Sequence, residues 1–204
     1  KRQDSITALG RGAFSGCNRL KSIVIPDSVI NIGISAFSEC KNLESVTLSK
    51  GLEKIGENAF YNCDSLQSIE IPKSLKDVYA TYDSIDTPNG VFNECSRLKT
   101  IVFEKGSTII ADALFRGCDG LESIVISDTI TQIYGYAFAD CKNLKNINIS
   151  DSVTVLEENV FQNDTSITEI NLPDSITALG RGVFSGCDRL KSIVIPDSVT
   201  TVSY

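Results

Sequence analysis

The sequence predicts an α/β solenoid of about eight 23-residue coils, with a parallel sheet on one face and short helical turns on the other. One observation is that phenylalanine recurs at a fixed interval, with six of seven spacings equal to 23 residues and one equal to 32. Another is that cysteine stands three residues after seven of these phenylalanines, and an aliphatic residue six after each. Such a period is typical of repeat proteins whose stacked units bury one another. The repeated residues are Phe14, Phe37, Phe60, Phe92, Phe115, Phe138, Phe161 and Phe184.

Each coil is expected to contain one short strand. Ile23 and Ile25 alternate with Ser22 and Val24, which is the period of a strand with one buried face. Aliphatic residues recur in every coil at the positions of the two isoleucines. Stacked coils would therefore align their strands in a parallel sheet, about 4.8 Å apart.

The remainder of each coil is expected to turn back and complete the core. Pro26-Asp27-Ser28 is a turn sequence, and Val29 and Ile32 after it are expected to point inward.

The segment around each phenylalanine predicts one helical turn. Ala36, Phe37 and Cys40 have a spacing that fits one inward side of such a turn. Gly33 before them is expected to let the chain turn sharply.

The 32-residue spacing lies between Phe60 and Phe92, and it places nine extra residues between these two phenylalanines. We expect an inserted loop over residues 79–90, at the junction of the third and fourth coils, because an insertion in a solenoid emerges without disturbing the core. Aromatic and acidic side chains in such a loop make good contact surfaces, although a tolerated decoration is the alternative. The candidate binding residues of the loop are Tyr79, Tyr82, Asp83 and Asp86.

Residues 1–204 are expected to form a single solenoid that is a fragment of a longer array. Residues 4–29 and 174–199 are identical at 24 of 26 positions, outward positions included. Packing alone does not require this, so we interpret it as recent duplication of a seven-coil unit, with an engineered or trimmed chain as the alternative. Neither end of the sequence carries a specialised polar cap, and bare end strands would allow end-to-end self-association.

The string IGENAFYNCDSLQSIEIPKSL at residues 55–75, and its seven relatives, resemble the BspA-like leucine-rich repeat. The motif A-F-x-x-C-x-x-L-x-x-I-x-I-P covers nearly the whole chain. This resemblance implies a leucine-rich-repeat solenoid and a surface protein of bacteria or some protozoa, several of which are implicated in adhesion to host matrix or to other cells. It therefore implies an extracellular, cell-surface location, with signal and anchor outside this sequence.

Composition argues against several functional classes. The net charge of −7 disfavours a nucleic-acid partner, and no apolar run approaches the roughly 20 residues of a membrane helix. Histidine is absent, which removes the commonest general base and the partner of a serine or cysteine nucleophile. We expect no enzyme activity, no cofactor and no direct membrane insertion.

The cysteines form the most prominent column of the repeat. Zinc motifs pair cysteines a few residues apart, whereas here the spacing is 23 or more, so we expect no metal. Stacked coils could bring neighbours within disulfide reach, but we favour buried free thiols that act as small hydrophobes. Asp164 takes the cysteine position in one coil. The structural thiols are Cys17, Cys40, Cys63, Cys95, Cys118, Cys141 and Cys187.

The outer face of the predicted sheet carries small hydroxyl residues and valines, which suit a plain ladder of β-compatible side chains. One local cluster departs from this pattern and is the best binding candidate on the face. Its members are Asn146, Asn148, Glu169 and Asn171, on two adjacent coils.

These observations favour a non-enzymatic protein-binding or adhesion module at a cell surface. Its ligand would be a protein or a glycan, of the host matrix or of another cell. A structural spacer that holds another domain away from the envelope is one alternative. An intracellular interaction scaffold is the other, which buried reduced thiols would suit.

Overall fold

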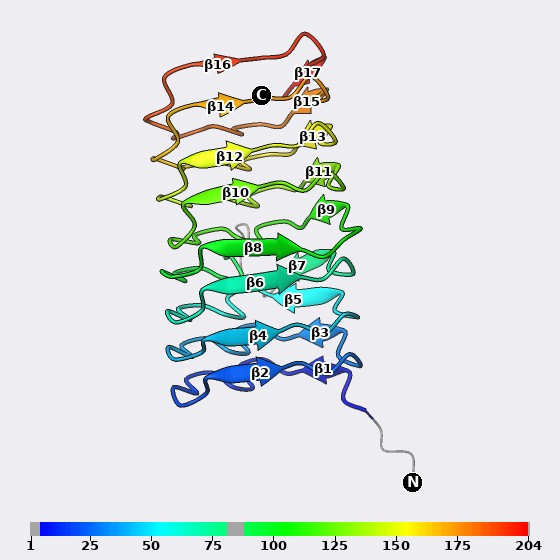
Figure 1. The fold of residues 1–204 in the computed structure, drawn as a ribbon, viewed down its shortest axis with the longest axis vertical. Helices are drawn as coiled ribbons and strands as arrows, with labels where there is room; N and C mark the ends of the chain where they lie inside the picture. Colours follow the sequence, from blue (N-terminus) through cyan, green and yellow to red (C-terminus); the bar gives the residue numbers. More distant parts are fainter. Residues whose placement is uncertain (1–4, 81–87, 204) are drawn as a thin grey trace.

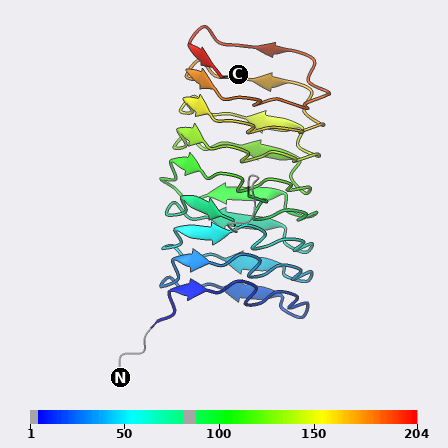
Figure 2. The same ribbon diagram turned by 180° about the vertical axis from the view of Figure 1, so that it is seen from behind.

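The computed structural model describes residues 5–80 and 88–203, and it is a solenoid of stacked coils (Figure 1). Each coil contributes one strand to a side sheet and one to a front sheet, and β17 after the eighth coil adds a further side strand; Figure 2 shows both sheets from behind. The front sheet contains β2 (Ser22–Val24), β4 (Ser45–Thr47), β6 (Ser68–Ile71), β8 (Thr100–Phe103), β10 (Ser123–Val125), β12 (Asn146–Asn148), β14 (Ile170–Asn171) and β16 (Ile193–Val194). The side sheet contains β1 (Ala8–Leu9), β3 (Asn31–Ile32), β5 (Lys54–Gly56), β7 (Asp77–Tyr79), β9 (Ile109–Ile110), β11 (Gln132–Ile133), β13 (Val155–Leu156), β15 (Ala178–Leu179) and β17 (Thr201–Val202).

All paired strands are parallel, and their register follows the sequence period. Ser22 lies opposite Ser45 in the front sheet, and Ser68 lies opposite Thr100 across the insertion. The side sheet was not predicted: the segment that contains Ile32 was expected only to point inward, and it forms a second ladder as well.

The hydrogen-bonded ladders are interrupted at definite junctions. The front sheet consists of the pairs β2–β4, β6–β8, β10–β12 and β14–β16, and the side sheet is divided between β7 and β9. Within the described residues, the junction between the fourth and fifth coils is the one that neither ladder crosses. Backbone bonds from Glu94 to Gly117 (2.9 Å) and from Gly120 to Cys95 (3.1 Å) cross it outside the sheets.

The predicted helical turns are wrong, because residues 5–80 and 88–203 contain no helix. A helix would need right-handed backbone throughout, but Ser35 and Glu39, on either side of Phe37, have φ values of 54° and 62°. Asn58 and Asn62 have the same left-handed backbone in the next coil, with φ of 56° and 53°. The segment is therefore a series of tight turns.

The backbone hydrogen bonds explain why turns replace the helix. The Ala36 N–H donates to the Gly33 carbonyl within its own coil (3.1 Å), whereas the Phe37 N–H donates to the Ala59 carbonyl of the next coil (2.7 Å). In a helix every such donor would bond within its own segment. Here every second donor binds the neighbouring coil, so the phenylalanine segments also hold the stack together.

The predicted core is confirmed. The side chains of Phe60, Cys63 and Ile69 are buried, as are those of Val29 and Ile32. The repeated phenylalanine rings stack in one file, with centroids of neighbouring rings 5.1 to 5.8 Å apart. Offset stacking at this distance adds to the free energy of burial.

Where a glycine precedes the phenylalanine segment, as at Gly33 and Gly56, it has a role other than the sharp turn predicted from Gly33. A Cβ atom at Gly33 would lie 2.5 Å from the carbonyl carbon of Gly10 in the preceding coil. A Cβ at Gly56 would lie 2.3 Å from the backbone nitrogen of Ile34. In these coils the glycine allows two backbones to approach closely, whereas the fifth, sixth and seventh coils carry Ala111, Tyr134 and Glu157 at the same position.

The described residues contain no helix that is long and apolar enough to cross a membrane.

Candidate binding surface

The exposed face of the front sheet presents an apolar column interrupted by a polar region. Val24, Val125 and Val194 have 71%, 69% and 80% of their surface exposed. These three valines lie on the separated strands β2, β10 and β16, and the exposed Val102 of β8 is the neighbour of Val125 in the column. The polar region lies between β12 and β14 and is the cluster that the sequence predicted.

A shallow hollow of about 200 Å³, which we call the amide hollow, lies at this cluster. Asn146 and Asn148 come from β12, Asn171 comes from β14, and Glu169 stands immediately before β14. The hollow lies over β10, β12 and β14, and no ladder hydrogen bonds join the neighbours β12 and β14. Lys145 and Val125 also line the hollow, and they add a positive charge and an apolar side chain respectively.

The four predicted side chains are free to bind a ligand. Among the described residues, none of them hydrogen-bonds to another part of the chain, and all four are exposed. Other asparagines differ: the Asn42 side chain donates to the Asn18 carbonyl (2.7 Å), and that of Asn143 donates to the Asp119 carbonyl (2.9 Å). Those amides tie coils together, whereas the amide hollow presents donors and acceptors without a structural partner.

Tyr79 does not lie in the amide hollow or on an open loop. It ends β7 in the side sheet, it is half-buried, and its hydroxyl donates to the Ile32 carbonyl at 3.2 Å. Burial raises the pKa of the Tyr79 phenol. The hydrogen bond with Asn31 and the charge of Lys54 lower this pKa by smaller amounts, and the charge of Asp77 raises it. This residue is tied to the scaffold. Tyr82, Asp83 and Asp86 lie outside the described residues, and their role stays a prediction.

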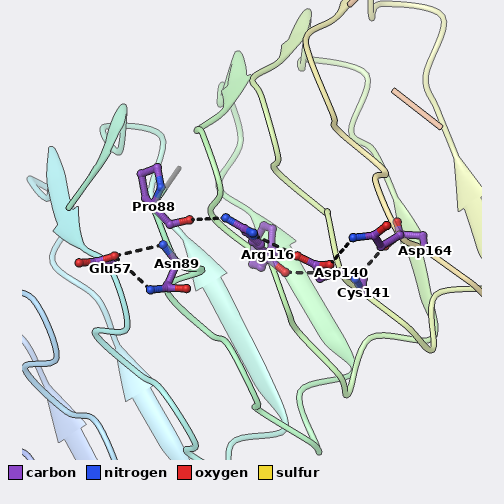
Figure 3. A network of polar contacts seen from close by, with 9 residues as sticks. Glu57, Pro88, Asn89, Arg116, Asp140, Cys141 and Asp164 are labelled. Atoms are coloured by element: carbon purple, nitrogen blue, oxygen red, sulfur yellow. Dashed lines mark hydrogen bonds and ion pairs between the residues drawn. The ribbon is translucent and has the colours of Figure 1, made fainter. Parts of the chain in front are cut away.

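The end of the predicted loop is anchored by a polar network that the sequence did not indicate (Figure 3). The Glu57 carboxylate accepts from the Asn89 backbone N–H at 3.1 Å. The Arg116 guanidinium donates to the Pro88 carbonyl at 3.3 Å and pairs with Asp140 at 3.1 Å. Arg116 therefore bridges the fourth and fifth coils, where neither sheet ladder continues, and also joins the fifth coil to the sixth.

Six of the seven predicted thiols are buried in the scaffold and form no reactive site, whereas Cys17, in the first coil, is exposed and departs from the prediction of a buried thiol. The thiol of Cys63 donates to the carbonyl of Phe37, and the thiol of Cys141 to that of Phe115, at 3.3 and 3.1 Å. Burial raises the pKa of Cys63 to about 12 and also raises the pKa of Cys141. A protonated thiol is a poor nucleophile and a poor metal ligand.

A second hollow of about 340 Å³ was missed by sequence reasoning. It opens between β4 and β6, another pair of neighbours without ladder bonds, and the free side chains of Lys50 and Glu70 border it. No sequence pattern reveals where a ladder is interrupted. The remaining lining residues are Val46, Thr47, Leu48, Pro72 and Glu104.

Metal-ligating side chains do not gather in the part of the chain that the structure describes: it contains no group of three or more that could hold an ion.

Similarity to known proteins covers nearly the whole chain. The family model described as the BspA type leucine rich repeat region, in six copies, matches residues 2–82 and 85–204. Among curated proteins, none matches the chain.

Solved bacterial proteins share the fold. A leucine-rich repeat protein from Eubacterium ventriosum is 25% identical with a TM-score of 0.68, over 88% of this chain and 45% of that one. One from Bacteroides ovatus is 27% identical with a TM-score of 0.65, over 97% and 55%. A leucine-rich cell surface protein from Faecalibacterium prausnitzii is 26% identical with a TM-score of 0.53, over 98% and 64%. The chain spans about half the length of the first two.

Proposed function

Because this chain belongs to the BspA-type leucine-rich repeat family, we propose that it is a non-enzymatic binding module of a cell-surface protein. Its ligand is a protein or a glycan, of the host matrix or of another cell. The location is supported by the similar Faecalibacterium prausnitzii protein, which is named a cell surface protein. The absence of histidine from the sequence supports a module without catalysis.

The observation that carries this proposal is the amide hollow. Its asparagine and glutamate side chains are exposed and hold no internal hydrogen bonds, so a ligand can engage them without breaking the scaffold. Carboxamides both donate and accept, which suits the hydroxyl groups of sugars and the amides of polypeptides. The exposed Val125 beside them supplies apolar contact. Each new hydrogen bond contributes about 0.5–1.5 kcal/mol net.

The test compares matched variants on a panel of purified matrix proteins and an array of mammalian glycans. Asn146→Ala with Asn171→Ala should weaken binding by about 5- to 150-fold, the loss of two hydrogen bonds. Ser22→Ala with Ser45→Ala is the control, because these serines are exposed on the paired strands β2 and β4 of the same sheet.

Tyr82→Ala tests the predicted loop in the same assay. Undiminished binding by the asparagine variant would remove the amide hollow from the proposal. Failure of the unaltered chain to bind any member of either panel would favour the structural spacer.

A further inference from the structure

The first coil exposes an end face that the eighth coil keeps covered. We call the side of the first coil that faces away from the second coil the N-terminal end face. Ile6 is 55% exposed there, whereas Ile176, the same residue in the duplicated segment, is fully buried. Cys17 is exposed, whereas Cys187 is buried. Two nearly identical segments thus differ in whether a neighbour covers this face.

The seventh coil, residues 151–173, covers this face of the eighth coil. Its Asn159 N–H donates to the Arg181 carbonyl (2.8 Å), and its Phe161 N–H donates to the Val183 carbonyl (3.0 Å). In return the Cys187 thiol donates to the Phe161 carbonyl at 3.1 Å. The first coil carries the same backbone groups and the same thiol without partners among the described residues.

Three glycines show that the face is shaped for a neighbour. A Cβ atom at Gly180 would lie 2.3 Å from the carbonyl carbon of Glu157, so the seventh coil packs against the space that a side chain at this residue would occupy. Around the equivalent Gly10, no atom lies within 4 Å of the corresponding position. The first coil therefore has a glycine at a position where, among the described residues, no backbone approaches it.

The other two glycines receive side chains. The Oδ1 atoms of Asn159 and Asn163 lie 2.3 and 2.4 Å from where Cβ atoms of Gly182 and Gly186 would be. Gly12 and Gly16 have nearly the same φ values as these glycines and nothing within 4 Å. They form two empty sockets of the size and position of an asparagine side chain.

We propose that the N-terminal end face is a docking surface for a further coil with the sequence of residues 151–173. The occupant carries asparagines at the two socket positions. The duplicated segments differ at only two positions, Ala13 and Val183 being one pair and Asn18 and Asp188 the other. In the eighth coil the Val183 carbonyl accepts from the Phe161 N–H, and Ala13 has the same backbone carbonyl. The contacts between the seventh and eighth coils therefore serve as a template for the contacts of the added coil with the first.

A second whole copy of the chain fits this face less well. The C-terminal end of such a copy presents β17 paired with β15, with the Thr200 N–H bonded to the Thr177 carbonyl at 3.0 Å. For the two copies to stack, β1 of one copy would have to pair with β15 of the other. In that other copy β17 already pairs with β15 and holds this position. A seventh-type coil leaves that position open, and this decides the choice of occupant.

The experiment extends the full chain by placing residues 151–173 directly before Asp4, in place of residues 1–3. The added coil contains no cysteine, so the reaction of Ellman's reagent with native protein still reports on Cys17. We expect Cys17 to react fast in the unextended chain and slower by about tenfold or more in the extended one, because reaction would then require local opening.

Gly10→Ala is the control variant in both chains. It has open space in the unextended chain, so Cys17 reactivity and thermal unfolding should not change there. In the extended chain it should clash with the added coil and restore fast reaction of Cys17. Equal Cys17 reactivity with and without the added coil, or protection that Gly10→Ala leaves intact, would overturn the proposal.

Discussion

Asp164→Asn should stabilise the protein at pH 7, and the gain in free energy of unfolding should grow with pH. Asp164 occupies the cysteine position of the seventh coil and is fully buried beside Cys141 (Figure 3). Its Oδ1 accepts from the Cys141 N–H at 2.7 Å, but Oδ2 is buried and finds no partner among the described residues. Burial, with a smaller contribution from the nearby Asp140, raises the pKa of Asp164 from 3.8 to about 9.

The direction of the effect follows from proton linkage. A carboxyl group whose pKa is raised on folding takes up a proton when the chain folds at any pH between the two values. Its contribution to stability is complete below about pH 4 and is lost progressively as pH rises to about 9. The loss is about 1.4 kcal/mol per pH unit, which amounts to about 4 kcal/mol at pH 7. Asparagine has a similar shape and needs no proton.

Urea unfolding of both proteins at pH 5, 7 and 8.5, with reductant present, measures this difference. The buried amide of the variant finds no acceptor at the Oδ2 position, at a cost of about 1–3 kcal/mol that does not change with pH. We therefore expect the stability of the variant relative to the unaltered protein to rise by about 3 kcal/mol between pH 5 and pH 7, and the variant to be the more stable of the two at pH 7. Asp151→Asn is the control, because Asp151 is exposed and its change should not produce a rising gain. A gain that stays constant with pH would show that Asp164 is ionised in the native protein and would refute the reasoning.

Two further predictions use the duplicated and repeated residues as internal controls. Gly180→Ala should destabilise by about 2 kcal/mol or more, because its Cβ would strike the Glu157 backbone, whereas Gly10→Ala should change the unfolding midpoint little; equal effects would contradict the close-approach explanation. Phe115→Ala should cost about 3–5 kcal/mol in urea unfolding, and Phe14→Ala clearly less, because Phe14 is 36% exposed at the end of the stack.

The repeat period was enough to predict the core and the order of the coils, because burial fixes residue type at each inward position. It could not separate a helical turn from a series of tight turns, since Ala36, Phe37 and Cys40 point inward in both. The distinguishing signal was the residue type at the left-handed positions: Asn58 and Asn62 belong to the type that tolerates positive φ.

The candidate site was predictable only where it depended on the period. Asn146 and Asn171 were placed on adjacent strands by counting from the phenylalanines, and the structure brings them together. Tyr79 was assigned to a loop because the insertion obscures the end of the preceding strand. The hollow beside Lys50 and Glu70 lies where β4 and β6 share no ladder bonds, and the repeat pattern is the same at this junction as at the paired ones, so the period does not locate it.

The junction between the fourth and fifth coils has a mechanical consequence. Among the described residues, at least one sheet ladder joins each of the other pairs of neighbouring coils, whereas this pair is joined by isolated backbone bonds, ring stacking, the Lys99–Glu122 ion pair (2.7 Å) and the bond from Arg116 to Pro88. The molecule therefore consists of two stiff blocks joined by a softer seam. Force applied to its ends would part the seam first and leave each block wound.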